Sequence, residues 1–207
     1  MYTLLKPLLV REELLKKGLC VFTPLEFSRI FLVPQHSIKY FLETQVHRGL
    51  FLRPKQGLYA LKTDLPTEKE MANRIYQPSY ISFAYALSYY GIIPEMPYQV
   101  TSATIKPTRV FANINPVFSY YKIKKQAFTG YIFKKEGGSS FLIAEPEKAV
   151  VDYAYFATLG RGPLLDRLYL KTLNKEKTIE YAKLYKRKGL VKRIEELFRN
   201  KQDWEIK

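Results

Sequence analysis

The stretch Phe22–Leu61, FTPLEFSRIFLVPQHSIKYFLETQVHRGLFLRPKQGLYAL, decides the fold predicted for the N-terminal part of the chain. Thr23 followed by Pro24 is a typical helix start, because a hydroxyl caps the helix and proline is tolerated at the first helical position. The pattern breaks at Pro34, where a second helix is expected to begin. Gly49 is expected to close that helix as a C-terminal cap. Its apolar residues share one face: Ile38, Phe41, Leu42 and Val46.

The residues after the second helix predict a β-hairpin. Two short runs, Leu50–Arg53 and Leu58–Leu61, are joined by Pro54–Gly57, whose glycine suits a turn position with positive φ. An amphipathic helix is also expected before Gly18. Three helices followed at once by a hairpin form the layout of a winged helix-turn-helix domain, which we predict for residues 1–63. The alternative is a small helical core with a surface hairpin.

Polar side chains lie on the face of the second helix opposite its apolar residues, mostly toward its N-terminal half. In helix-turn-helix proteins this part of the recognition helix enters the major groove. The residues predicted to contact bases are Gln35, His36, Ser37, Lys39 and Tyr40. Those predicted to contact phosphates are Arg29, Arg48, Arg53 and Lys55, and Thr23 and Gln56 complete the DNA-binding set. Each of these side chains has the alternative of being a solvated surface group.

The charge of the chain favours an anionic partner. Of its 207 residues, 47% are hydrophobic and 26% charged, which is typical of a folded globular protein, and the net charge is +15. Residues 1–63 hold ten Lys/Arg against four Asp/Glu, and residues 64–207 hold 24 against 15. Both parts are therefore basic, but charge alone does not choose among DNA, RNA, an acidic protein and a membrane surface.

Cysteine content and hydropathy predict a cytoplasmic protein. A single cysteine, Cys20, excludes an internal disulfide framework and fits a reducing compartment. The N-terminal apolar run is interrupted by charges at Arg11, Glu12 and Glu13, so it does not read as a signal peptide. No window reaches the roughly 18–20 apolar residues of a membrane span, and no membrane partner is predicted.

The remainder of the chain predicts a second, α+β domain at residues 76–207, after a linker or bridging helix at 64–75. Ser79 is interpreted as the cap of a helix that runs to Gly91. Five short runs then predict one antiparallel sheet: Tyr98–Ile105, Thr108–Ile114, Phe118–Ile123, Phe128–Phe133 and Ser139–Ile143. Flanking helices are expected from Glu145-Pro146-Glu147 onward and near 164–171, 176–188 and 189–199.

The sequence contains no pattern typical of a catalytic or metal site. The two histidines, His36 and His47, are eleven positions apart on one predicted helix, too far to share an ion or serve a nucleophile. The remaining candidate is an acidic cluster near Glu145, in which Lys148 and Asp152 have the i, i+4 spacing of an ordinary surface ion pair. We therefore predict no enzymatic activity, no cofactor and no metal; a nucleic-acid-processing enzyme is the least favoured alternative.

Two runs of the second domain resemble a known family. YQPSYISFAYALSYYGIIPE begins at Tyr76, and FLIAEPEKAVVDYAYF begins at Phe141 after a strand-rich interval. In order and spacing they are similar to the AbiEi antitoxins of the AbiE abortive-infection systems, which are type IV toxin–antitoxin systems. The resemblance implies a DNA-binding repressor of its own operon, joined to a domain that counteracts a nucleotidyltransferase toxin.

The resemblance also implies the partners. The expected DNA is double-stranded, with inverted repeats in the chain's own promoter, bound by a monomer or weak dimer that pairs on DNA. A toxin-facing surface is one hypothesis for the basic C-terminal residues Lys186, Arg187, Lys188, Lys192 and Arg193. The others are added non-specific DNA affinity and a solvated helix face. The alternative function is a stand-alone winged-helix regulator whose C-terminal domain senses a partner.

Overall fold

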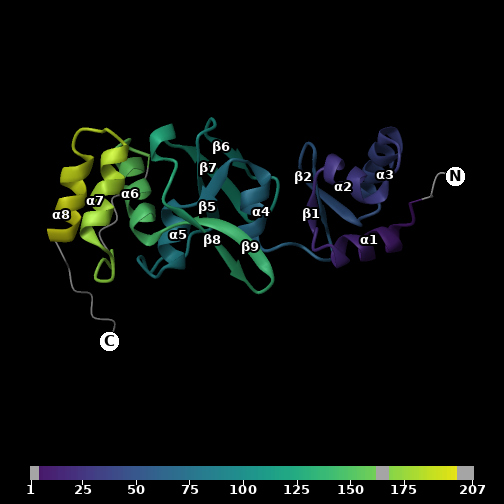
Figure 1. Ribbon diagram of the computed structural model, residues 1–207, viewed down its shortest axis with the longest axis horizontal. Helices are drawn as coiled ribbons and strands as arrows, with labels where there is room; N and C mark the ends of the chain where they lie inside the picture. Colours follow the sequence, from purple (N-terminus) through teal and green to yellow (C-terminus); the bar gives the residue numbers. More distant parts are fainter. Residues whose placement is uncertain (1–4, 162–167, 200–207) are drawn as a thin grey trace. The chain divides into compact units, whose positions relative to one another are not determined.

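The computed structural model describes residues 5–161 and 168–199, which form a mixed α+β structure with eight α-helices and two sheets (Figure 1). The chain divides into two compact units, Met1–Ile75 and Tyr76–Lys207. The segment predicted as a linker or bridging helix, residues 64–75, falls in the first unit. None of the helices in the described part of the chain is long and apolar enough to span a membrane.

The first unit contains four helices and a three-stranded sheet. Its elements are α1 (Pro7–Lys16), β1 (Val21–Phe22), α2 (Pro24–Phe31), α3 (Gln35–His47), β2 (Phe51–Lys55), β3 (Leu58–Leu61) and α4 (Glu68–Ile75). Strand β3 is central and pairs antiparallel with both β1 and β2. The order from α1 to β3 is compatible with a winged helix. The two-residue strand β1 was not predicted.

The core of the first unit is aromatic and explains how its helices are oriented. Phe22 contacts Phe27, Phe51 and Tyr59 at ring-centroid distances of 5.5, 5.3 and 6.2 Å. Phe41 of α3 lies 6.0 Å from Phe27 and 6.3 Å from Phe51. Aromatic side chains from β1, α2, α3, β2 and β3 thus meet in one cluster, which fixes α3 by its apolar face.

The second unit is built on a six-stranded sheet in the order β6-β7-β5-β4-β9-β8. Its strands are β4 (Ser79–Ile81), β5 (Gln99–Thr104), β6 (Arg109–Phe111), β7 (Val117–Lys122), β8 (Tyr131–Glu136) and β9 (Ser139–Ala144). The prediction of a purely antiparallel sheet was wrong, because β5 pairs with β7 and β4 with β9 in parallel. Ser79 lies in β4 and is not a helix cap; the N-cap position of the following helix is occupied by Ser82.

Among the described residues of this unit, four α-helices and one 3-10 turn accompany the sheet. They are α5 (Phe83–Tyr89), η1 (Lys125–Ala127), α6 (Pro146–Ala157), α7 (Lys175–Leu184) and α8 (Leu190–Arg199). Helices α6, α7 and α8 pack on one another, and Figure 1 shows them side by side. The helix predicted at 164–171 lies partly outside the described residues, and 168–171 are not helical. Helix α7 begins within one residue of the predicted start at 176, but it ends at Leu184, before the predicted end at 188.

Candidate nucleic-acid interface

Helix α3 presents the polar face that the sequence predicts. Ile38, Phe41 and Leu42 are buried, as is the polar Gln45, which was not predicted to be in the core. The exposed residues of the helix and its C-cap are Gln35, His36, Lys39, Tyr40, Glu43, His47 and Arg48, and Ser37 is half-buried. Tyr40 is 74% exposed, which is a large exposed fraction for an aromatic ring. The face is therefore available to a ligand.

Four of the candidate residues line a common hollow beside α3. His36, Ser37, Tyr40 and Arg48 belong to a pocket of about 560 Å³, whose other walls include Pro7 at the start of α1 and Leu5, which precedes that helix. Gln35 and Lys39 do not line it. The face of α3 thus combines a shallow apolar depression with polar and basic groups around it.

The predicted phosphate contacts lie on elements that adjoin α3. This helix packs against both α2 and β2. Arg29 is exposed on α2, and Arg53 is exposed on β2 with its guanidinium carbon 5.8 Å from the centre of the Tyr59 ring. Lys55 is half-buried at the end of β2, and Gln56 is exposed in the turn. Cationic and amide side chains are therefore present on the two elements that contact α3 and in the turn after β2.

Thr23 has a structural role that accounts for its position. Its hydroxyl accepts a hydrogen bond from the Glu26 backbone N–H at 3.2 Å, and its backbone N–H donates to Glu26 Oε2 at 2.7 Å, a complete capping box. Arg74 of α4 donates to both Glu26 oxygens at 2.7 and 2.6 Å. Burial alone would raise the pKa of Glu26, but the hydrogen bonds from Arg74 and Thr23 outweigh it and hold that pKa below its ordinary value.

Replacing Thr23 with Ala is expected to lower the free energy of unfolding by about 1 kcal/mol, because the helix loses its N-cap. Thr23→Ser keeps a hydroxyl at the same position and should lose much less. Urea denaturation followed by circular dichroism measures both. Equal stability of the wild type and the Ala variant would show that the capping box contributes nothing.

In the second unit, a buried polar cluster connects the sequence runs that begin at Tyr76 and at Phe141. Lys148 and Asp152 form an ion pair in which both side chains are 0% exposed. Asp152 also accepts hydrogen bonds from Tyr80 at 3.0 Å, from Ser82 at 2.7 Å and from the Tyr185 hydroxyl. The interpretation of Lys148 and Asp152 as a surface ion pair was therefore wrong. The two residues do pair at i, i+4 spacing, but Tyr80 of β4 and Tyr185 at the end of α7 cover the face of α6 that carries them.

Burial dominates the electrostatics of this cluster. It lowers the pKa of Lys148, although the neighbouring Asp152 carboxylate acts in the opposite direction. It raises the pKa of the Tyr80 and Tyr185 hydroxyls well above their ordinary value, and the Asp152 charge adds to that effect. Because all of these groups are inaccessible to solvent, they offer no reactive atom to a substrate. Their hydrogen bonds connect β4, α6 and the end of α7 and so stabilise the unit.

The start of α6 is joined to α7 by a second, more exposed set of contacts. Lys177 Nζ lies 3.1 Å from Glu145 and 3.7 Å from Glu147, and Tyr181 donates a hydrogen bond to Glu145. Burial would raise the pKa of Glu145, but the hydrogen bonds from Tyr181 and Lys177 more than offset this and lower it. The acidic residues of this segment are thus ion-pair partners. Among the described residues, no group of three or more His, Cys, Asp or Glu could hold a metal ion.

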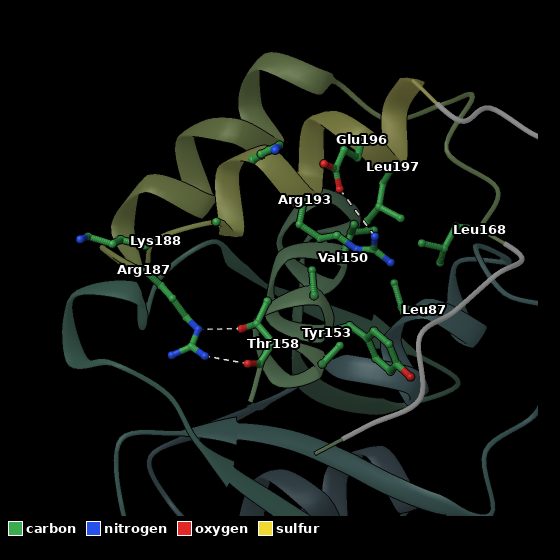
Figure 2. A pocket seen from close by; sticks show the side chains of 14 residues that line it. Leu87, Val150, Tyr153, Thr158, Leu168, Arg187, Lys188, Arg193, Glu196 and Leu197 are labelled. Atoms are coloured by element: carbon green, nitrogen blue, oxygen red, sulfur yellow. Dashed lines mark hydrogen bonds and ion pairs between the residues drawn. The ribbon is translucent and has the colours of Figure 1, made fainter. Parts of the chain in front are cut away.

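The basic residues predicted to bind a partner occupy the segment between α7 and α8 and the first turns of α8. Four of them, Arg187, Lys188, Lys192 and Arg193, line a pocket of about 370 Å³ (Figure 2). Arg187 donates to the Thr158 hydroxyl at 2.8 Å and to its carbonyl at 2.6 Å, so it caps the end of α6. Lys186 is exposed, and its carbonyl accepts from Lys124 at 3.3 Å.

Sequence reasoning missed the buried residues that organise the second unit, Tyr80, Ser82, Lys148, Asp152 and Tyr185. One signal was present: Lys148 and Asp152 belong to KAVVDYAY, a run whose other residues place apolar side chains on every side of the helix. A helix that is apolar all round is buried, so its charged members must be paired inside the protein.

The sequence matches no model of a known protein family, and a search of curated proteins finds no match. The resemblance to AbiEi antitoxins therefore stays a prediction from the motifs.

Proposed function

We propose that the chain is a DNA-binding protein that represses its own promoter through a winged helix-turn-helix in its first unit. In this proposal, Gln35, His36, Ser37, Lys39 and Tyr40 contact bases from the N-terminal half of α3. Arg29, Arg48, Arg53 and Lys55 contact phosphates, and the turn after β2 serves as the wing.

The observation that carries this proposal is the exposed polar face of α3. A helix fixed by a buried aromatic cluster on one side, with amide, imidazole and ammonium groups exposed on the other, has the side-chain chemistry used to read the major groove. The cations on α2 and β2 supply the electrostatic attraction to the phosphate backbone, in agreement with the net charge of +15.

We further propose that this repressor is the antitoxin of an AbiE-type operon and counteracts a nucleotidyltransferase toxin. Support comes from the two motif runs and from their meeting in one buried cluster through Tyr80, Ser82, Lys148 and Asp152. Residues that build a shared core are expected to recur together in a family. Co-expression with the product of a neighbouring nucleotidyltransferase gene would test this part, and continued growth arrest would contradict it.

DNA binding is tested by titrating the full chain against a labelled duplex from upstream of its own gene and against a shuffled duplex of equal length. The own duplex should bind more tightly. With four phosphate contacts, its affinity should fall by roughly 100-fold between about 50 and 200 mM salt. Equal affinity for both duplexes would remove the repressor function, and affinity that is independent of salt would remove the phosphate contacts.

A further inference from the structure

A pocket in the second unit combines an apolar wall with basic and other polar side chains. It encloses about 370 Å³ between α6, α8 and the end of α5. Its apolar lining is formed by Leu87, Val150, Tyr153, Ala154, Ala157, Leu168 and Leu197. Small-molecule sites are typically concave, mostly apolar and equipped with a few polar groups that fix the orientation of the ligand.

The polar group that faces this apolar lining is Arg193. In Figure 2 its side chain extends from α8 into the space bounded by Val150, Leu197 and Leu87. Among the described residues it pairs with Glu196, one helical turn along, with an N–O distance of 3.6 Å. Both side chains are 38% exposed, and such a long, exposed pair contributes little stability. A ligand carboxylate that binds closer to Arg193 can therefore displace Glu196 with little loss of protein stability.

The other cations at the rim are not equivalent to Arg193. Arg187 is held by its two hydrogen bonds to Thr158 and by the Tyr155 ring, 5.9 Å from its guanidinium carbon. Lys188 points away from the apolar lining in Figure 2. Arg193 thus combines a planar guanidinium, which suits bidentate carboxylate binding, with a position over apolar side chains.

We propose that this pocket binds an amphipathic organic anion, a carboxylate with a short hydrocarbon body. The carboxylate pairs with Arg193 in place of Glu196, and the hydrocarbon lies against Val150, Tyr153 and Leu197. This site is independent of the proposed DNA binding, since every group in it belongs to the second unit. The inference can therefore fail while the DNA-binding proposal stands, and the reverse also holds.

The test is calorimetric titration of the full chain with octanoate, 1-octanol and acetate in the absence of DNA. Octanoate carries both the charge and the hydrocarbon and should bind most tightly, while octanol and acetate each lack one of them. Arg193→Gln should weaken octanoate binding by about tenfold or more, because the charge-assisted hydrogen bonds are lost. Glu196→Gln should strengthen it several-fold, because the competing carboxylate is removed.

Lys188→Gln is the matched control. It also removes one positive charge from the rim of the pocket, but from a side chain that points away from the apolar lining. It should change octanoate affinity by less than about twofold. Circular dichroism verifies that the three variants fold. The proposal is overturned if octanoate does not bind, if octanol binds as tightly, or if Lys188→Gln weakens binding as much as Arg193→Gln does. Glu196→Gln without any gain in affinity would exclude the displacement of Glu196.

Discussion

Asp152→Ala is expected to lower the free energy of unfolding of the second unit by about 3–5 kcal/mol, because it leaves Lys148 buried without its counter-charge. Asp152 is 0% exposed and accepts hydrogen bonds from Tyr80, Ser82 and Tyr185 as well as from Lys148. Its removal takes this acceptor from four donors in a region that excludes water, and it leaves Lys148 Nζ with the uncharged Tyr185 hydroxyl at 3.2 Å. Urea denaturation, together with hydrogen exchange of the α6 amides, measures the loss.

Two further variants make this prediction decisive. Asp152→Asn keeps an acceptor oxygen but not the charge, so it should fold and lose less than the Ala variant. Lys17→Gln breaks the Glu13–Lys17 pair, which has the same i, i+4 spacing and a distance of 3.3 Å but is exposed, and should cost less than about 1 kcal/mol. Similar losses for Asp152→Ala and Lys17→Gln would contradict the structural role of the buried cluster.

The second large effect is expected at the face of α3. Replacing Gln35, His36 and Lys39 together with Ala should weaken binding to the own upstream duplex by about 100-fold or more, since each base or phosphate contact is worth about 1–3 kcal/mol. All three side chains are exposed, so the stability of the first unit should be unchanged. Fluorescence anisotropy with labelled duplex gives the affinities, and urea denaturation verifies the fold.

Lys16→Ala is the control for charge, because it removes one exposed cation from α1, outside the predicted interface. It should reduce affinity by only a few-fold, and equally for own and shuffled duplex. If the triple variant lost no more affinity than Lys16→Ala, α3 would not be the recognition helix, whatever the affinity of the protein for DNA.

The elements of the first unit could be predicted because their signals are local. The Thr23 cap, the break at Pro34 and the apolar spacing from Ile38 to Leu42 depend only on neighbours within a few residues, and the structure confirms the boundaries of α2 and α3 within about one residue. Strand β1 was missed because two residues, Val21–Phe22, carry no period; only their pairing with β3 makes them a strand.

The second unit could be predicted only in part, because its organisation depends on distant residues. The five predicted runs overlap β5 to β9, but β4 was not predicted as a strand. The partners of the strands are not readable from alternation, so the parallel pairs β5–β7 and β4–β9 were missed. The burial of Lys148 and Asp152 needs Tyr80, 72 residues before Asp152, and Tyr185, 33 residues after it. The pocket beneath Arg193 likewise arises from α6 and α8 packing together.

The most direct test of the central claim, that α3 lies against DNA, is photo-cross-linking from one position on that helix. Tyr40 is replaced with p-benzoylphenylalanine, and the variant is irradiated with its own upstream duplex. The matched control carries the same group at Tyr98, which is 99% exposed and belongs to the second unit. We predict a strong cross-link from position 40 and little from position 98. A variant that binds the duplex but gives no cross-link from position 40 would contradict the account.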